Sequence, residues 1–367
     1  MFLYTVDRSC INSILGLLPV YQVFRMYRVS VRVSVAVHHY VRTTWTLDTF
    51  LDRWFGPDSS EDVMDKLDEC GAIISGSTVL QFLSRLPPNP ESDLDIFVPL
   101  TGLLEFGRWL QRTGYTYRPR GTSPMTFFDV AALTVPARWS AGKHAPVTFD
   151  PLSFVQPFEV FDFVDETERR LDRTRSERLQ LVVILGDPRK HILTFHSTVV
   201  MNYISGSKAV SIFPISTVDA QVSWVCRGPP SVGGAVYGAH PSWREKYKAR
   251  GYSVVDGYGP EMTPEPNELK LQRSIGDTYT WTIDFERAPV FARRGGLSDP
   301  VKERDKVAFE IITTSRGPVT SGCYMNISPP FTTSFVDEST FAITGTFAYL
   351  DTWPYGGTFE TIAAFGV

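Results

Sequence analysis

Two aspartates separated by one residue, Asp93 and Asp95, are the side chains of this sequence best suited to chemistry. They alternate with Leu94, Ile96 and Val98, and side chains on a strand alternate between its faces, so both carboxylates are expected on one face. Carboxylate oxygens are hard ligands of the kind that Mg²⁺ prefers, and Mg²⁺ bridges such groups to substrate phosphates. The spacing therefore predicts a magnesium site on one face of this strand.

A small turn lies upstream of the aspartates, between a buried strand and a helix. The apolar run 71–75 predicts the strand, Gly76 and Ser77 interrupt it, and 78–83 has the pattern of a helix. Backbone N–H groups at such a turn attract phosphate oxygens, and the Ser77 hydroxyl adds a hydrogen-bond donor. Together, the turn and the aspartates predict a site for a nucleoside triphosphate.

This combination resembles the DNA polymerase β-like nucleotidyltransferase superfamily. The signature of that superfamily is an apolar strand, Gly-Ser or Gly-Gly, a helix, and then two acids separated by an apolar residue. The matching residues here are Gly76, Ser77, Asp93 and Asp95, and the resemblance covers about residues 60–215. It implies a nucleoside triphosphate against the Gly-Ser turn, metal ions on the two aspartates, and transfer of a nucleotidyl group to an acceptor that the sequence does not identify.

The superfamily pattern includes a third carboxylate on a later strand, which completes the metal site and accepts the proton of the attacking hydroxyl. In the strand predicted at 179–185 the equivalent position is Gln180, whose neutral amide cannot act as a general base. The other candidates are Asp162, Asp150 and Asp129, and Asp162 has the most apolar neighbours. Two functions therefore stay open: a nucleotidyltransferase, and an interaction protein that keeps the fold without turnover.

An Asp-x-Asp pair also occurs at solvated strand ends and in turns, where it has no chemical role. From the spacing of Asp93 and Asp95 alone, that explanation is the more frequent one. The preceding strand, the Gly76–Ser77 turn and the helix favour the nucleotidyltransferase-like fold, and they leave catalysis open.

Composition limits the class of protein. The chain has 367 residues, of which 43% are hydrophobic and 13% aromatic, enough for two compact domains. A net charge of −4 and a pI near 5.9 disfavour a nucleic-acid partner, so a nucleic-acid sensor or polymerase-like enzyme ranks below the other two functions. The four cysteines form no Cys-x-x-Cys pair, which argues against a zinc ribbon or a disulfide framework.

No stretch of the sequence approaches the roughly 20 apolar residues that a membrane-spanning helix needs. The short apolar piece 11–20 lacks the basic start of a secretory signal. We therefore expect no membrane partner and an intracellular, cytoplasmic location.

The expected fold class is α+β, with a nucleotidyltransferase-like mixed sheet, flanking helices and a β-rich C-terminal region. Residues 1–59 form an N-terminal strand and helix, 60–215 form the core with an irregular insertion near 115–157, and 216–367 form the β-rich region. The expected strands outside the core centre are 29–37, where valines recur at every second position, 278–284, 308–312 and 340–347. The expected helices are 46–55, 60–67, 78–83 and 101–112.

Asp187 and Pro188 predict the capped start of a further helix that runs through Phe195 to Val200 and contains His196 as a packed or capping residue. The segment 195–202, with the regions around the turn and the aspartates, is also loosely similar to a set of uncharacterised proteins of mushroom-forming fungi, and this similarity implies no activity.

The basic and aromatic stretch 243–252 has two interpretations. Its arginines and lysines could contact phosphates while its aromatic rings stack on bases. Alternatively, it is a solvated helix end whose long side chains lie along apolar surface, and we favour this interpretation.

Overall fold

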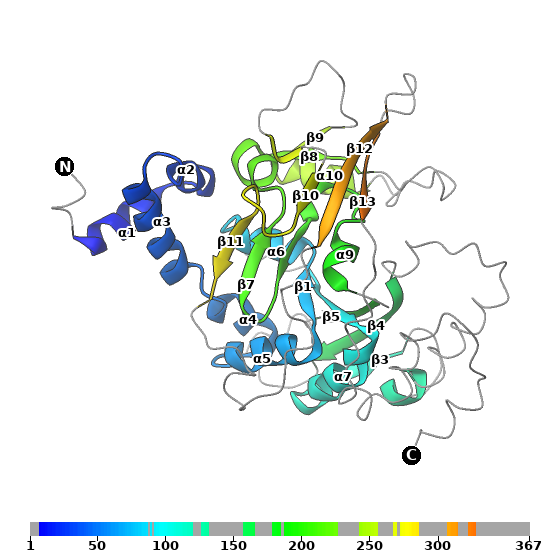
Figure 1. The fold of residues 1–367 in the computed structure, drawn as a ribbon. Helices are drawn as coiled ribbons and strands as arrows, with labels where there is room; N and C mark the ends of the chain where they lie inside the picture. Colours follow the sequence, from blue (N-terminus) through cyan, green and yellow to red (C-terminus); the bar gives the residue numbers. More distant parts are fainter. Residues whose placement is uncertain are drawn as a thin grey trace.

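The computed structural model shows a chain of mixed helix and strand organised by one large mixed sheet, which confirms the α+β class (Figure 1). The structure describes residues 7–86, 89, 92–119, 126–131, 157–165, 178–184, 187–226, 242–255, 267–269, 272–285, 307–314 and 322–327.

The large sheet has eight strands in the order β11-β7-β6-β1-β2-β5-β4-β3. The pair β2 and β5 is parallel, and all other neighbouring pairs in this sheet are antiparallel. The strands are β1 (Ile73–Ser75), β2 (Leu94–Pro99), β3 (Tyr115–Arg118), β4 (Pro157–Asp165), β5 (Arg178–Ile184), β6 (Asn202–Ile204), β7 (Lys208–Ser211) and β11 (Trp281–Asp284). The predicted strands 71–75, 93–98 and 179–185 are confirmed, and they lie next to one another at the centre of the sheet.

Helices pack against the sheet, with α4, α5 and α7 gathered together and the N-terminal helices α1 to α3 extending beside β11 (Figure 1). The helices are α1 (Arg8–Leu17), α2 (Val20–Met26), α3 (Val31–Thr44), α4 (Asp48–Phe55), α5 (Ser60–Cys70), α6 (Ser77–Leu83), α7 (Leu103–Arg112), α9 (Pro188–Ile192) and α10 (Ser242–Ala249). The helices predicted at 46–55, 60–67, 78–83 and 101–112 are therefore confirmed as α4 to α7.

The two faces of β2 belong to different hydrophobic clusters. Leu94, Ile96 and Val98 are buried in the larger cluster, which contains side chains of α3, α4, α5 and α7. Phe97 belongs to a second cluster with Ile192 of α9. Because side chains alternate along a strand, Asp95 lies on the Phe97 face.

The strand predicted at 29–37 is wrong, because this segment forms the start of helix α3. Ser30 caps the helix, and its hydroxyl accepts a hydrogen bond from the backbone N–H of Val33 at 3.3 Å. Two of the alternating valines, Val31 and Val35, are 82% and 65% exposed. The buried positions are instead Val37, Tyr40 and Val41, which follow the helical period.

The long helix predicted from Asp187 is also wrong beyond its first turns. Asp187 does cap α9, since its carboxylate accepts from the backbone N–H of Arg189 at 2.8 Å. The helix ends at Ile192, and Thr194 then donates from both its N–H and its hydroxyl to the carbonyl of His191, at 2.8 and 2.7 Å. This local bonding competes with helix continuation. His196 therefore lies in the turn that precedes a 3-10 helix, η4 (Thr198–Val200), and not inside a helix.

The described parts of the C-terminal region contain strands, as expected. β11 matches only the second part of the strand predicted at 278–284, β12 (Ala308–Thr314) contains the strand predicted at 308–312, and 340–347 lies outside the described residues. The remaining strands there are β8 (Val222–Trp224), β9 (Ser253–Val255), β10 (Gln272–Ser274) and β13 (Gly322–Ile327). β11 pairs with β7, so a strand from the region assigned to 216–367 completes the sheet of the region assigned to 60–215. In the segment assigned to an insertion, β3 and a helix at 127–131 are described.

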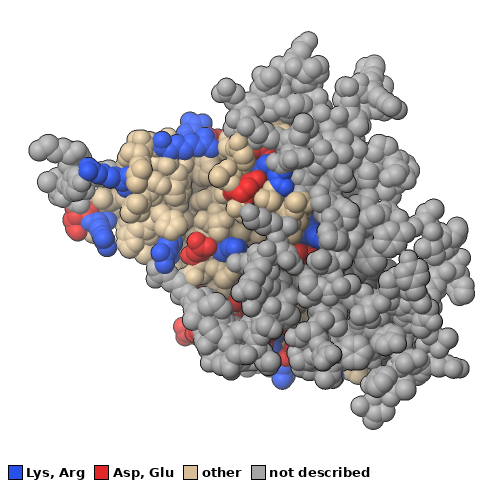
Figure 2. Space-filling model, in the orientation of Figure 1, with Lys and Arg blue, Asp and Glu red and all other residues tan. Residues whose placement is uncertain are grey.

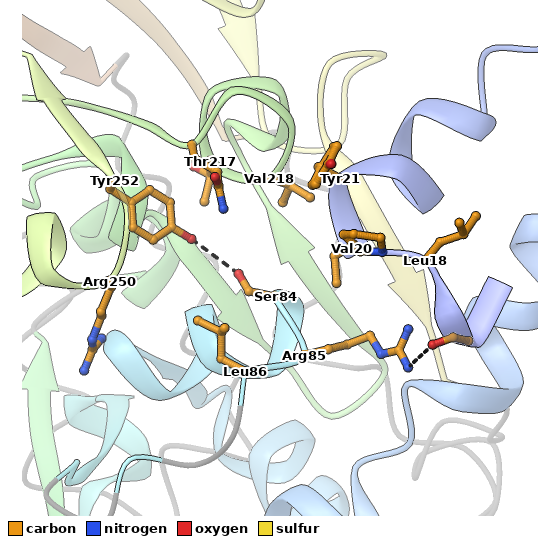
Figure 3. Close-up of a pocket in the computed structure, with 13 residues that line it drawn as sticks. Leu18, Val20, Tyr21, Ser84, Arg85, Leu86, Thr217, Val218, Arg250 and Tyr252 are labelled. Carbon is orange, nitrogen blue, oxygen red and sulfur yellow. Dashed lines mark hydrogen bonds between the residues drawn. The ribbon is translucent and has the colours of Figure 1, made fainter.

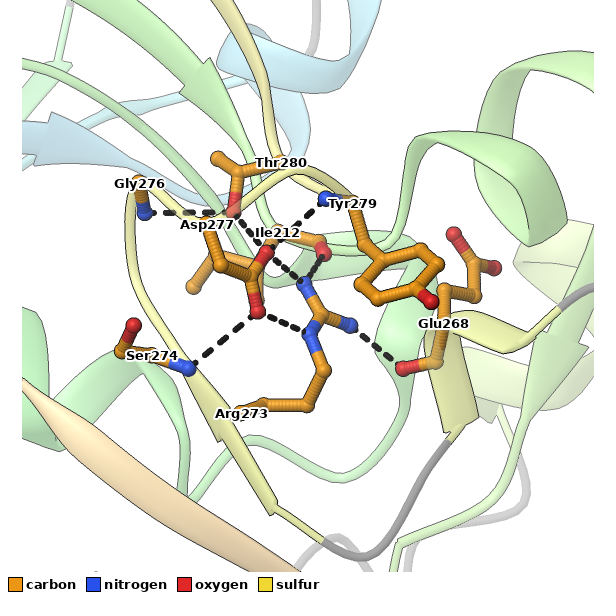
Figure 4. Close-up of polar contacts among 8 residues, drawn as sticks. All are labelled: Ile212, Glu268, Arg273, Ser274, Gly276, Asp277, Tyr279 and Thr280. Atoms are coloured by element: carbon orange, nitrogen blue, oxygen red, sulfur yellow. Dashed lines mark hydrogen bonds and ion pairs between the residues drawn. The ribbon is translucent and has the colours of Figure 1, made fainter.

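A buried arginine joins this C-terminal region to the core (Figure 4). The fully buried side chain of Arg273 donates to the carbonyl of Ile212 at 3.1 Å and to the carboxylate of Asp277 at 2.5 and 2.9 Å, and it also donates to the carbonyl of Glu268. A buried guanidinium needs such partners because an unpaired buried charge is costly. The network therefore ties the turn after β10 to the end of β7.

The face seen in Figure 2 carries acidic and basic side chains scattered over its described part, without one continuous basic patch. Among the described helices, none combines the length and the apolar character that crossing a bilayer requires.

Candidate functional site

The Gly76–Ser77 turn brings the backbone into close contact with the Asp95 carboxylate. A Cβ atom built on Gly76 would lie 2.4 Å from Oδ2 of Asp95, and Gly76 has a φ of +83°, which side-chain-bearing residues rarely adopt. β1 and β2 set this contact, because Ser75 and Asp95 are paired across the two strands. Ser77 is the first residue of α6 and is partly exposed beside this contact. The structure thus brings together the two elements that the sequence singled out.

Asp95, Gln180 and Asp162 form a row across three neighbouring strands. Gln180 of β5 is paired in register with Asp95 of β2 on one side and with Asp162 of β4 on the other. The amide of Gln180 donates to Oδ1 of Asp162 at 3.0 Å. Two strand spacings separate the backbones of Asp95 and Asp162, about 10 Å. Gln180 therefore occupies the position next to Asp95, and Asp162 lies one strand beyond it.

Arg178 at the start of β5 links the outer carboxylates of this group. Its guanidinium lies 3.9 Å from Oδ2 of Asp93 and 3.9 Å from Oδ1 of Asp162. About half of the Arg178 side chain is exposed, so water screens these contacts.

The carboxylates have perturbed acidity. Burial, followed by the charge of Asp93, raises the pKa of Asp95 to about 7. Burial also raises the pKa of Asp93, opposed by Arg178 and reinforced by the charge of Asp162. Carboxylates that disfavour one another's ionised form at close range mark a place where a cation would be stabilised.

Helix α10 lies against this site, although it is far away in the sequence. Lys246 is close enough to Asp93 and Asp95 to lower the pKa of both carboxyls, against the larger effect of burial. On the same helix, the ring of Trp243 stacks on His196 with 4.0 Å between centroids. Burial lowers the pKa of His196 to about 4, with smaller contributions from Lys246 and Arg244. His196 is therefore a neutral packing partner near neutral pH.

In the basic and aromatic stretch 243–252 the rings pack into the protein, as the favoured interpretation expects, so they are not available to stack on bases. Trp243, Tyr247 and Tyr252 are buried in one cluster with residues of α6 and η4, whereas Lys246 is exposed. Sequence reasoning did not connect Lys246 with the aspartates. The alternation of buried rings and charged residues at helical spacing was the available signal.

Of the two other candidate acids, the structure describes only Asp129. Asp129 caps the helix at 127–131, since its carboxylate accepts from the N–H and the hydroxyl of Thr126 at 3.2 and 2.6 Å. Asp150 lies outside the described residues.

The donor set for a metal ion consists of two carboxylates. Within the described parts of the chain, no group of three or more His, Cys, Asp or Glu side chains is arranged to hold a metal ion. Mg²⁺ is nevertheless commonly held by one or two carboxylates, with substrate phosphates and water as its other ligands. Asp93 and Asp95, whose ionised forms are disfavoured in the free protein, fit that mode.

Comparison of the chain with protein-family models, with curated proteins and with solved structures finds no match.

Proposed function

We propose that this chain has a nucleotidyltransferase-like fold, binds a nucleoside triphosphate with Mg²⁺ at Asp93 and Asp95, and transfers its nucleotidyl group to an acceptor hydroxyl. The observation that carries the proposal is the contact between Gly76 and the Asp95 carboxylate. This contact places a partly exposed backbone turn and paired acids within one small site, where a cation and phosphate oxygens complement each other.

In this proposal each residue has a distinct task. Asp93 and Asp95 hold the cation, which when bound neutralises phosphate charge and aligns the phosphate for attack. Gly76 lets the Asp95 carboxylate lie directly against the backbone turn, and Ser77 donates a hydrogen bond to the phosphates. The exposed Lys246 adds a positive charge near the two aspartates, where it attracts the triphosphate.

Asp162 serves the acceptor in this scheme. It lies too far from Asp95 to share one ion directly, because Gln180 and its strand stand between them. The Gln180 amide donates to Oδ1 and so orients the Asp162 carboxylate. The proton of the attacking hydroxyl passes to Asp162 while the new oxygen–phosphorus bond forms and pyrophosphate departs.

A second function is favoured by Gln180 itself. The carboxylate nearest to Asp95 in the row is replaced by an amide, and Asp162 is already engaged by Gln180 and Arg178. A chain that binds the triphosphate without transferring it, and presents its C-terminal strands to a partner, matches this arrangement.

Calorimetry with each of the four ribonucleoside triphosphates and Mg²⁺ tests the binding step. We expect binding that is lost in the Asp93→Asn/Asp95→Asn variant and is unchanged in Asp62→Asn, which removes an exposed carboxylate at the start of α5. Binding by the double variant equal to that of the original chain would refute the site.

Release of pyrophosphate in the presence of candidate hydroxyl acceptors separates the two functions. Release that disappears in Asp162→Asn, while triphosphate binding persists, supports transfer. The other outcome is that the original chain binds the triphosphate without releasing pyrophosphate, whereas the Gln180→Glu variant releases it. This outcome would show that Gln180 is the reason why the chain does not transfer the nucleotidyl group.

We also propose an intracellular location, because three of the four cysteines, Cys10, Cys70 and Cys226, are free thiols, which are typical of reducing compartments.

A further inference from the structure

The N-terminal helices α1 to α3 carry most of the large apolar side chains that the described part of the chain exposes. We call residues 8–44, which form these helices and their links, the N-terminal extension. Five of the seven exposed side chains of this kind belong to it: Ile14, Leu17, Val29, Val31 and Val35, each between 54% and 86% exposed. Single exposed apolar side chains are normal, but their concentration in one part of a surface marks an interaction site.

The inner side of the extension is fixed to the core. Leu15, Val23 and Val37 are at most 2% exposed and belong to the larger hydrophobic cluster. Arg85, which follows α6, donates to the Gly16 carbonyl at 3.4 Å (Figure 3). The exposed apolar side chains therefore lie on the outer side of helices whose inner side already serves the fold.

On α3 the exposed valines follow the period of the helix. Val31 and Val35 are one turn apart and so share a face, and Arg32 is exposed beside them. Arg28 and Val29, just before this helix, are exposed as well. An exposed valine adds neither buried area nor a strong helix preference, so the fold alone does not account for these residues.

The extension is also strongly basic. It contains five arginines and no acidic residue, although the whole chain has a net charge of −4. Arg8, Arg25, Arg28 and Arg32 are exposed, and only Arg25 among these four forms an ion pair with the core, through Asp219. In Figure 2 the extension is a mostly tan surface with basic side chains along its margins. Its surface therefore combines positive charge with aliphatic groups.

This combination favours a lipid surface over a protein partner. A symmetric contact with a second copy of the chain would bring the arginines of two extensions together. Trp, Tyr and Arg dominate the binding energy of protein interfaces, whereas the exposed apolar side chains here are all aliphatic. A fluid bilayer accepts separate aliphatic side chains without a surface of matching shape, and anionic headgroups supply the charge opposite to arginine.

We propose that the N-terminal extension binds the surface of an anionic lipid bilayer. Val29, Val31 and Val35 enter the headgroup region, and Arg28 and Arg32 pair with lipid phosphates. The expectation of no membrane partner concerned helices that cross a bilayer, and none of the described helices is long and apolar enough for that. A helix that lies on the surface needs only an apolar face with basic residues beside it. This surface uses no residue of the proposed triphosphate site and does not depend on it.

Sedimentation with lipid vesicles tests the proposal. One set of vesicles contains phosphatidylcholine alone, and the other contains phosphatidylcholine and phosphatidylserine at about two to one. We expect at least tenfold tighter binding to the mixed vesicles at about 0.1 M salt and loss of most of this preference at about 1 M, where charges are screened within about 3 Å. Equal binding to the two kinds of vesicle at low salt, or binding to neither, would overturn the proposal.

Removal of the basic side chains places the binding in the extension. Arg28→Gln/Arg32→Gln should weaken binding to the mixed vesicles at least tenfold. The control is Arg112→Gln/Lys248→Gln, which removes two exposed positive charges from other helices and should change the affinity little. An equal loss of affinity in the two double variants would overturn the assignment to the extension.

Removal of the valines tests the apolar contact. Val31→Gln/Val35→Gln should bind the mixed vesicles several-fold more weakly, and its melting temperature should not fall, because both positions are exposed and glutamine favours a helix more than valine does. Unchanged affinity in this variant would refute insertion of the valines. Size-exclusion chromatography addresses the alternative occupant: a dimer of the original chain that this variant loses would assign the surface to a second copy and overturn the proposal.

Discussion

Gly76 and Asp95 lie so close together that a single added carbon on Gly76 would reach 2.4 Å from the Asp95 carboxylate. This contact joins the turn before α6 to the strand β2, and it makes the shape of the proposed site depend on the absence of a side chain at one position.

Gly76→Ala should therefore destabilise the fold and displace Asp95. Gly56→Ala is the matched control, because Gly56 has nearly the same φ, +82°, but no atom within 4 Å of an added Cβ. We expect roughly 1 kcal/mol of backbone strain in the control and about 1–3 kcal/mol more in Gly76→Ala, measured by denaturant unfolding.

Asp95→Ala should suppress much of the extra cost of Gly76→Ala, because it removes the nearest carboxylate atoms. A double-mutant cycle measures this coupling. Strictly additive effects of Gly76→Ala and Asp95→Ala would contradict the proposed clash.

The affinity for Mg²⁺–triphosphate should rise with pH. Burial and the neighbouring Asp93 raise the pKa of Asp95 to about 7, and the cation binds only the ionised carboxylate. Calorimetry should show affinity increasing about fivefold between pH 6 and 7, about tenfold in all by pH 8, and levelling off above that pH. An affinity that is constant from pH 6 to 8 would count against Asp95 as a ligand.

The free protein should show the opposite trend in stability. The folded chain keeps the Asp95 proton up to about pH 7, whereas the unfolded chain releases it near pH 3.8. Protonated Asp95 therefore stabilises the folded chain fully below pH 3.8, and this stabilisation is lost as the pH rises to 7. Asp95→Asn should flatten the dependence in that window. An unchanged slope in the variant would show that other groups cause it.

Lys246→Gln should weaken triphosphate binding about tenfold and shift its pH dependence upward. The lysine lowers the pKa of Asp95, so its removal makes the carboxylate harder to ionise. Lys248→Gln is the control on the same helix, since Lys248 pairs with Glu245. If Lys246→Gln and Lys248→Gln weaken binding equally, the cause is the general loss of positive charge and not a specific role of Lys246.

Glu268→Ala should cost roughly 3 kcal/mol of stability. The buried carboxylate accepts from the backbone N–H groups of Ile215 and Ser216 at 2.8 and 2.5 Å and from the Ser216 hydroxyl, so its removal leaves these donors without a partner. Glu245→Ala, at an exposed position, should change stability by less than about 0.5 kcal/mol in the same unfolding experiment. Similar values for the two variants would refute a stabilising role for these hydrogen bonds of Glu268.

Local sequence patterns were sufficient to predict the strands and the helix at the centre of the sheet. The apolar run before Gly76, the turn and the alternation around Asp95 predicted β1, α6 and β2, because each signal involves residues only a few positions apart. The same kind of local evidence failed at Val31 and Val35. Alternating valines fit a strand, but the Ser30 cap and the packing of Val37 and Tyr40 favour a helix.

The sequence by itself determined the candidate acids, the turn that precedes them in the chain and the presence of Gln180 on an apolar strand. Only the tertiary structure decided that Gln180 stands in register between Asp95 and Asp162, and that Lys246 of α10 lies against the aspartates. Strand register and helix docking depend on contacts between residues far apart in the chain, which burial and packing select together and which no local spacing encodes.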